Sequence, residues 1–301
     1  MNLDIILQKS SNELKKSGIP TASLDARVLL EDVLKKDANY FFTHPNLPLT
    51  NSEYARFRSL IRRRKAGEPI AYLTGHKEFY GYDFFINKNA LIPRPETELI
   101  VDETINYLKS QISNLKNKER TSIIDIGTGS GCIIISLVLE LDKLSTFNFQ
   151  LKCYASDISP RALYVARKNA KLHKVNKEIR FFQSDLFNNK IIPKKCDIII
   201  ANLPYVPKSM SNVKCNMSKV RNGIYWEPKE AIFADDNGTK IVKRFLDQVK
   251  ERINNGGLIL IEVDPRNAKE LKNYTQNIFP KSNIELIKDL AKLDRILRVL
   301  N

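Results

Sequence analysis

The sequence predicts an α/β fold in which helices cover a parallel β-sheet, preceded by a small helical bundle and a β-hairpin. From residue 121 onward, short apolar runs rich in β-branched residues alternate with amphipathic segments of helical period. Before residue 75 the apolar spacing is helical throughout, and a short segment around a Tyr-Gly turn separates the two parts. The expected divisions are a helical domain over 1–75, a hairpin linker over 76–92 and the α/β domain over 93–301.

The N-terminal part predicts three helices and a hairpin. The first helix covers 2–18, a second is capped by Ser23 or Asp25, and a third covers 52–66. The third helix carries the run Arg62-Arg63-Arg64, which is either a solvated helix face or a contact for an acidic partner. The hairpin follows from alternation on both sides of a turn at residues 80–81.

The α/β part begins with Pro93-Arg94-Pro95-Glu96-Thr97-Glu98, which leads into a helix over 96–110 whose first turn favours acids. In open parallel sheets, ligands bind beyond the carboxyl ends of the strands, so residues at those ends are the candidates for a site. The strands are expected at 121–126, 152–156, 179–183, 197–201, 258–263, 284–288 and 295–300, and the helices at 132–141, 160–173, 239–253 and 265–278.

The first of these strand ends is rich in glycine: Gly127-Thr128-Gly129-Ser130-Gly131 follows Asp125 and opens a helix. Glycines allow a ligand to approach the backbone amides and the helix N-terminus, because no Cβ intervenes. The spacing is neither G-x-G-x-x-G nor a phosphate loop, since no Lys follows. It resembles the first motif of Rossmann-like S-adenosylmethionine (AdoMet) methyltransferases, although a turn that serves only packing has the same residues.

Two acids complete a candidate AdoMet site. Asp157 ends the second strand, where a carboxylate can accept hydrogen bonds from ribose hydroxyls, although it can also cap the helix behind it. Asp185 ends the third strand and can accept from an adenine amino group while Leu186 covers the ring, or it can serve a turn.

At the carboxyl end of the fourth expected strand lies the segment Asn202-Leu203-Pro204-Tyr205. A planar NH2 group is a poor nucleophile because its lone pair is delocalised. The Asn202 side-chain oxygen and the Leu203 carbonyl can hold its two N–H bonds and aim the nitrogen at a methyl group, while Tyr205 stacks on its plane. A proline-rich turn with a capping Asn is the structural alternative.

These motifs together resemble the HemK/PrmC family, through 92–98, 125–131, 202–205 and Trp226-Glu227-Pro228. The resemblance covers nearly the whole chain and implies a Rossmann-like class I AdoMet-dependent methyltransferase domain. It implies methyl transfer from AdoMet to the side-chain amide nitrogen (N5) of the glutamine in the Gly-Gly-Gln motif of class-1 peptide chain release factors. It also implies that Asn202, Leu203, Pro204 and Tyr205 bind the substrate and carry the reaction, with Asn202 also contacting AdoMet.

One residue departs from the family, which usually has proline where this chain has Leu203. Asn-Leu-Pro-Tyr also resembles the motif of RNA adenine-N6 dimethyltransferases, so an RNA or DNA adenine methylase remains the alternative. Three features favour the HemK/PrmC family over the adenine dimethylases, which lack them: the helical domain, the hairpin and Pro93–Glu98. A third possibility is a module that binds AdoMet or RNA without catalysing a reaction. In that case the Asn202 turn would have no function.

Composition bounds the remaining possibilities. The 301 residues carry 49 Lys and Arg and a net charge of +15, which fits either an acidic partner or solvated faces. Three histidines and four scattered cysteines predict no metal site, and no apolar run suits a membrane span or a secretion signal. We expect a cytoplasmic monomer with a release factor as partner and no stable nucleic-acid partner. The segment 207–228 is either a lid or a surface loop.

Overall fold

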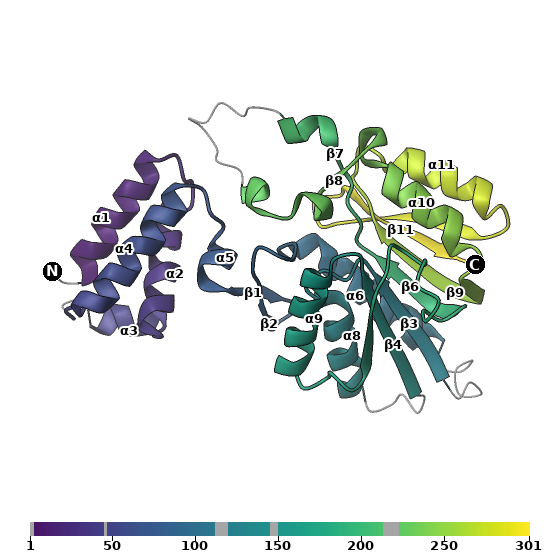
Figure 1. Ribbon diagram of the computed structural model, residues 1–301, viewed down its shortest axis with the longest axis horizontal. Coiled ribbons are helices and arrows are strands. Elements are labelled where there is room, and N and C mark those ends of the chain that lie inside the picture. Colours follow the sequence, from purple (N-terminus) through teal and green to yellow (C-terminus); the bar gives the residue numbers. More distant parts are fainter. Residues whose placement is uncertain (1–2, 45–46, 112–119, 145–149, 213–222) are drawn as a thin grey trace. The chain divides into compact units, whose positions relative to one another are not determined.

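The structure is a computed structural model, and it describes residues 3–44, 47–111, 120–144, 150–212 and 223–301 (Figure 1). These residues divide into two compact units. The first contains the residues up to His76 together with Gly223–Trp226, and the second contains Lys77–Asn212 and Glu227–Asn301. The division into 1–75, 76–92 and 93–301 stays a prediction.

The first unit is helical. Its helices pack around a core that includes Leu14, Leu29, Phe57 and Ile61, none of which is exposed. Two short helices, α3 and α5, were not predicted, because neither is long enough to show a helical period. The helices are α1 (Leu3–Lys16), α2 (Ala22–Leu34), α3 (Ala38–Thr43), α4 (Asn51–Lys65) and α5 (Ile70–Thr74).

The arginine run on α4 is largely engaged within this unit. Arg63 donates to Glu68, and the Arg64 guanidinium lies 2.7 Å from the Asp25 carboxylate, which is buried. The sequence suggested Asp25 as a cap of α2, but its carboxylate instead pairs with Arg64. The helix α2 begins after Thr21, which makes no side-chain capping bond. The helix α4 is capped by Thr50, which forms a reciprocal capping box with Glu53.

The hairpin consists of β1 (His76–Phe79) and β2 (Tyr82–Phe85), as predicted. Tyr80 and Gly81 have φ of 54° and 75°, which gives the turn a twist that matches the strands. Asn169 fixes the hairpin to the body of the second unit, since its side chain bonds both the backbone N–H and the carbonyl of Phe85.

A seven-stranded sheet forms the centre of the second unit, in the order β10-β11-β9-β6-β3-β4-β5. The pairs among β9, β6, β3, β4 and β5 are parallel, whereas β11 runs antiparallel to β9 and β10. The expectation of a fully parallel sheet is therefore wrong at β11, because residues 289–293 are too short for a crossover. The strands are β3 (Arg120–Ile126), β4 (Gln150–Asp157), β5 (Ile179–Gln183), β6 (Cys196–Ala201), β9 (Ile253–Glu262), β10 (Asn283–Lys288) and β11 (Asp294–Leu300).

Helices cover both faces of the sheet: α6, α8 and α9 lie together on one face, and α10 and α11 lie on the other (Figure 1). The helix predicted over 239–253 ends earlier, at Val249, and Ile253 already begins β9. The helices are α6 (Glu98–Ser110), α8 (Cys132–Lys143), α9 (Pro160–Leu172), α10 (Lys240–Val249) and α11 (Ala268–Ile278). Short elements complete the unit: η1 (Pro95–Thr97), η2 (Lys208–Asn212), η4 (Lys229–Ala231), η5 (Asp236–Gly238), β7 (Val206–Pro207) and β8 (Phe233–Ala234).

The strand register determines which residues meet at the carboxyl edge of the sheet. Ile126 of β3 pairs with Ala201 of β6, and Ala201 pairs with Ile261 of β9. The residues that follow these three, namely Gly127, Asn202 and Glu262, therefore lie side by side at the carboxyl edge. This is the point at which the strand order reverses, where open α/β sheets bind ligands.

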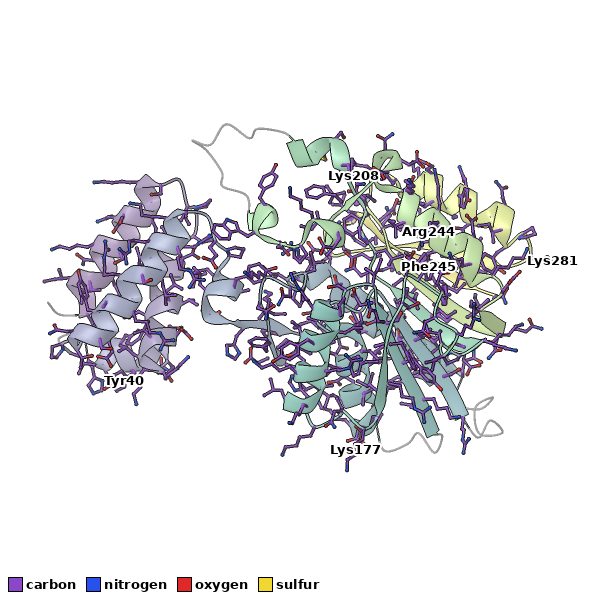
Figure 2. All side chains as sticks on the ribbon, in the orientation of Figure 1. Tyr40, Lys177, Lys208, Arg244, Phe245 and Lys281 are labelled. Atoms are coloured by element: carbon purple, nitrogen blue, oxygen red, sulfur yellow. The ribbon has the colours of Figure 1, made fainter. Side chains whose placement is uncertain are left out.

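The basic side chains lie partly in solvent and partly at one cavity. Lys177 and Lys281 are exposed at the periphery of the second unit, whereas Lys208 and Arg244 line a cavity (Figure 2). Of the cysteines, Cys132, Cys153 and Cys196 are buried and form no disulfide. Within the described ranges, every helix is too short or too polar to cross a membrane.

Candidate active site

The glycine turn after β3 adopts a backbone that only glycine accepts without strain. Gly127, Gly129 and Gly131 have φ of 76°, 56° and 81°. A Cβ on Gly127 would lie 3.0 Å from the Leu203 side chain, so the turn and the Asn202 segment are in direct contact. The amides of Gly127 and Thr128 donate to the Ser156 carbonyl, which ties the turn to β4.

Only part of this turn faces a cavity. Gly127 and Gly129 line it, whereas Thr128 and Ser130 are buried. The Thr128 hydroxyl donates to Asp125 at 2.6 Å, and the Ser130 carbonyl accepts from Asn169. Gly131 serves packing, because a Cβ there would lie 3.0 Å from the Ile135 side chain. Of the five residues predicted to bind AdoMet at the turn, the structure thus brings two to the cavity wall.

Asp125 is a fully buried carboxyl beneath the turn. Burial raises its pKa to about 7, against the lowering effect of the Thr128 hydrogen bond. One of its oxygens has no partner among the described residues. A raised folded-state pKa means that the native state holds the proton more tightly, so the stabilising contribution is complete at low pH and is lost as pH rises toward 7.

We therefore expect Asp125→Asn to remove this pH dependence. Between pH 5 and pH 8, the free energy of unfolding of the wild type should fall relative to that of the variant by roughly 2–3 kcal/mol. Denaturant titrations of both proteins at the two pH values measure this difference. If the two proteins differ in free energy of unfolding by the same amount at both pH values, Asp125 is not the titrating group.

The cavity has a volume of about 600 Å³, within the range of small-molecule sites. Asp157 lies on its wall and is nearly buried. Its two oxygens accept hydrogen bonds from the backbone amides of Gly129 and Ser159, at 2.9 and 2.8 Å. Burial raises its pKa, while these two hydrogen bonds act in the opposite direction. The helix behind it is capped by Ser159, so Asp157 does not itself cap α9.

Asp185 and Leu186 also line the cavity. The Asp185 carboxylate lies 2.6 Å from the guanidinium of Arg244, a partner that the sequence analysis did not foresee. Leu186 is buried in a left-handed conformation, with φ of 51°. The structure thus places both predicted residues at the cavity, with Asp185 held by an ion pair.

Asn202, Leu203 and Pro204 follow β6 and line the same cavity. Among the described residues, none donates a hydrogen bond to the Asn202 side-chain oxygen or to the Leu203 carbonyl. Leu203 is 4% exposed and belongs to the core under the sheet, so a leucine side chain has a defined place here. Two residues that line the cavity therefore each carry an acceptor without a donor among the described residues.

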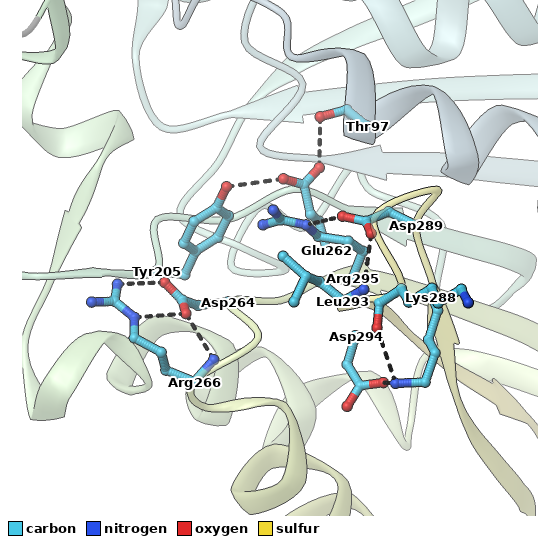
Figure 3. Close-up of polar contacts among 11 residues, drawn as sticks. Thr97, Tyr205, Glu262, Asp264, Arg266, Lys288, Asp289, Leu293, Asp294 and Arg295 are labelled. Carbon is cyan, nitrogen blue, oxygen red and sulfur yellow. Dashed lines mark hydrogen bonds and ion pairs between the residues drawn. The ribbon is translucent and has the colours of Figure 1, made fainter.

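Glu262, at the end of β9, is the residue that the sequence analysis missed. It is buried, and it accepts hydrogen bonds from the Thr97 and Tyr205 hydroxyls at 2.6 and 3.0 Å (Figure 3). The Asn202 amide donates to it as well, at 2.8 Å. A signal was present, because an acid in an otherwise apolar strand is seldom buried without a role. Thr97 was missed for another reason: its segment was interpreted as the start of a helix and as part of the family resemblance, with no role for the hydroxyl.

Tyr205 is fixed through its hydroxyl. Burial and the Glu262 carboxylate raise the pKa of Tyr205 far above its ordinary value, so the hydroxyl stays a neutral donor. Its ring lies close to Glu262, as Figure 3 shows, and not on the cavity wall. The expected stacking of Tyr205 on a substrate stays a prediction.

The segments that carried the resemblance meet in space. The Glu227 carboxylate is buried and accepts from the Ile92 amide and from the Arg94 guanidinium, at 2.9 and 2.5 Å. The segment 92–98 is thereby bound to the residues that follow 223–226. The segment 207–228 falls partly outside the described residues, at 213–222, so its interpretation as a lid stays a prediction. In the ranges that the structure describes, no three His, Cys, Asp or Glu residues are grouped as metal ligands.

Comparison with known proteins identifies the family of both parts of the chain. Residues 6–75 match the PrmC N-terminal domain, and residues 117–297 match a methyltransferase domain. A release factor glutamine methyltransferase of Koribacter versatilis is 33% identical, with 98% of this chain and 97% of that protein covered. The chain belongs to the release factor glutamine methyltransferase family. One from Rhodopirellula baltica is also 33% identical, over 97% and 94% of the two chains.

Two further similarities have narrower meaning. A bifunctional methyltransferase of Rickettsia typhi is 32% identical over 98% of this chain, which spans only 56% of that relative. The solved catalytic domain of hMettl16, in complex with a MAT2A 3′UTR hairpin, is 18% identical with a TM-score of 0.53, over 92% of this chain and 91% of that one. The second similarity supports the class I methyltransferase fold alone.

Proposed function

We propose that the protein transfers a methyl group from AdoMet to the side-chain amide nitrogen, N5, of the glutamine in the Gly-Gly-Gln motif of class-1 peptide chain release factors. The names of its relatives support a release factor glutamine as the substrate. The observation that carries the proposal is the pair of free acceptors, on Asn202 and Leu203, at the wall of the cavity. They match the two N–H bonds of a primary amide.

The cavity fits AdoMet in size and in chemistry. Gly127 and Gly129 present backbone without side chains, and Leu186 and Ile158 supply apolar wall. Each oxygen of Asp157 accepts one hydrogen bond, which leaves lone pairs free for ribose hydroxyls. AdoMet, when bound, supplies a methyl group on a positively charged sulfur, which makes that methyl electrophilic.

The residues of this chain act on the glutamine. The Asn202 and Leu203 oxygens accept its two N–H bonds, which orients the nitrogen and offsets the positive charge that develops on it as the new bond forms. Proton loss from nitrogen follows methyl transfer, so the site requires no strong base. Consistent with this, the acid nearest to Asn202, Glu262, is occupied by three donors.

The same acceptors would hold the amino group of adenine, so adenine-N6 transfer to RNA or DNA is the competing function. The matching N-terminal domain at residues 6–75 favours the protein substrate. The purified chain, with AdoMet labelled on its methyl group, should be offered in parallel a class-1 release factor, the same factor without its Gly-Gly-Gln glutamine, and ribosomal RNA. We expect label on the first alone, in the absence of any nucleic acid.

Label on RNA alone would overturn the proposal in favour of the adenine alternative. Label on both forms of the release factor would place the methyl on another residue. The mobility of the active enzyme on a sizing column, measured in the same preparation, tests the expectation of a monomer.

A further inference from the structure

We propose that Glu262 and Thr97 are positioning residues that hold the Asn202 amide with its oxygen, and not its NH2 group, toward the substrate. This inference rests on the proposed function, because it assumes that Asn202 accepts from the group to be methylated. It assigns a role to Thr97 in the segment 93–98 and to a buried acid, neither of which touches the cavity.

The need for such a device follows from the shape of an amide. The oxygen and the NH2 group of Asn are nearly the same size, so either can face the cavity. Only one orientation is productive, because an outward NH2 group would meet the N–H bonds of the substrate, donor against donor. An Asn side chain without fixed partners would divide its time between the two orientations.

The contacts of Asn202 select one orientation. Its Nδ2 lies 2.8 Å from Glu262 Oε2 and 3.2 Å from Thr97 Oγ1. The Thr97 hydroxyl directs its own proton to Glu262 Oε2, so Thr97 Oγ1 and Glu262 Oε2 both act as acceptors toward the Asn202 NH2 group. The amide oxygen, which accepts no hydrogen bond from the described residues, is then left for the substrate, since Asn202 lines the cavity.

Glu262 is itself fixed by its other donors. The Thr97 hydroxyl donates to Oε2 at 2.6 Å and the Tyr205 hydroxyl to Oε1 at 3.0 Å, so each oxygen is engaged (Figure 3). Burial raises the pKa of Glu262, whereas the hydrogen bonds from Thr97 and Tyr205 and the charge of Arg295 lower it. Burial prevails, so the pKa of Glu262 is raised overall, and both of its oxygens accept hydrogen bonds, from the Thr97 and Tyr205 hydroxyls and from the Asn202 amide.

The backbone explains why these groups stay in place. Ala201 and Ile261 are register partners in adjacent parallel strands, so Asn202 and Glu262 leave the sheet together. Thr97 ends the short helix η1, directly before α6. The geometry therefore comes from rigid elements and does not depend on a loop.

An exchange of donor and acceptor tests the contact directly. In Asn202→Asp, two carboxylates would face each other at this distance, and we expect a large loss of methyl transfer to the release factor at pH 8. In the double variant with Glu262→Gln, the introduced amide can donate its NH2 group to the introduced carboxylate, which keeps an oxygen toward the substrate. In the Asn202→Asp background, Glu262→Gln should raise turnover by about tenfold. In the wild-type background, the same substitution should lower turnover.

A second series tests Thr97. Thr97→Val should lower kcat by about tenfold, and Thr97→Ser should restore most of it, because the hydroxyl returns. AdoMet affinity, measured by calorimetry, should stay unchanged in both. Thr104→Val is the matched control: it removes another buried threonine hydroxyl, which donates to the Ile100 carbonyl within α6, and it should leave activity unchanged.

The proposal is overturned if Glu262→Gln lowers the turnover of the wild type and of Asn202→Asp by the same factor, or if Thr97→Val and Thr104→Val behave alike. Failure of the proposed function is a separate result, because it shows in the wild type as absence of label on the release factor. The same variants can then be compared on whichever acceptor the wild type methylates.

Discussion

Replacing Asn202 with alanine is expected to lower the rate of methyl transfer by at least about a thousandfold. The variant loses the side-chain oxygen that orients the nucleophilic nitrogen and stabilises the charge developing on it. The binding of AdoMet should be preserved, since Gly127, Gly129, Asp157 and Leu186 still line the cavity. The loss should therefore appear in kcat and not in the dissociation constant of AdoMet.

Single-turnover transfer from labelled AdoMet to the release factor measures this effect, with calorimetry as the binding control. Alanine also leaves Glu262 with one donor fewer, so thermal unfolding of the variant must be checked in the same buffer. A folded variant with the turnover of the wild type would remove Asn202 from the reaction.

The second large effect is expected from Asp157→Ala, which should weaken AdoMet binding by at least about thirtyfold. Hydrogen bonds to a charged group contribute about 1.5–3 kcal/mol each, and the carboxylate is expected to accept from the ribose hydroxyls. The variant also frees the Gly129 and Ser159 amides, so the turn loses a fixed partner. Asp157→Asn is the matched control for shape, and calorimetric titration with AdoMet measures both variants.

An unchanged dissociation constant in Asp157→Ala would assign this residue to the fold of the turn alone. An equal effect of Ala and Asn would show that the charge matters more than the oxygen atoms. At saturating AdoMet, kcat should recover in either variant, in contrast to Asn202→Ala.

Much of the fold could be predicted because it depends on local patterns. The strand at 179–183 was predicted with both ends correct, since Ile179, Phe181 and Phe182 favour a strand and Ser184-Asp185 follow it. The glycine turn and Asn202 were found because strand ends in a parallel sheet are where ligands bind. The hairpin followed from a Tyr-Gly turn between alternating residues.

The remainder depends on contacts between distant segments. The hydrogen bond between Asn202 and Glu262 follows from the pairing of β6 with β9, which no local pattern specifies. The ion pair of Asp185 with Arg244 joins a strand end to a helix in the same way. The antiparallel β11 was missed because apolar periodicity carries no information on strand direction.

The position of the methyl group on the release factor distinguishes transfer to the Gly-Gly-Gln glutamine from transfer to any other group. The factor should be incubated with the enzyme and with AdoMet that carries a deuterated methyl group, digested, and analysed by tandem mass spectrometry. We expect one labelled methyl on the side chain of the Gly-Gly-Gln glutamine, and none when Asn202→Ala replaces the wild-type enzyme. A labelled methyl on any other residue, or an unmodified glutamine after an incubation in which RNA becomes labelled, would contradict this expectation.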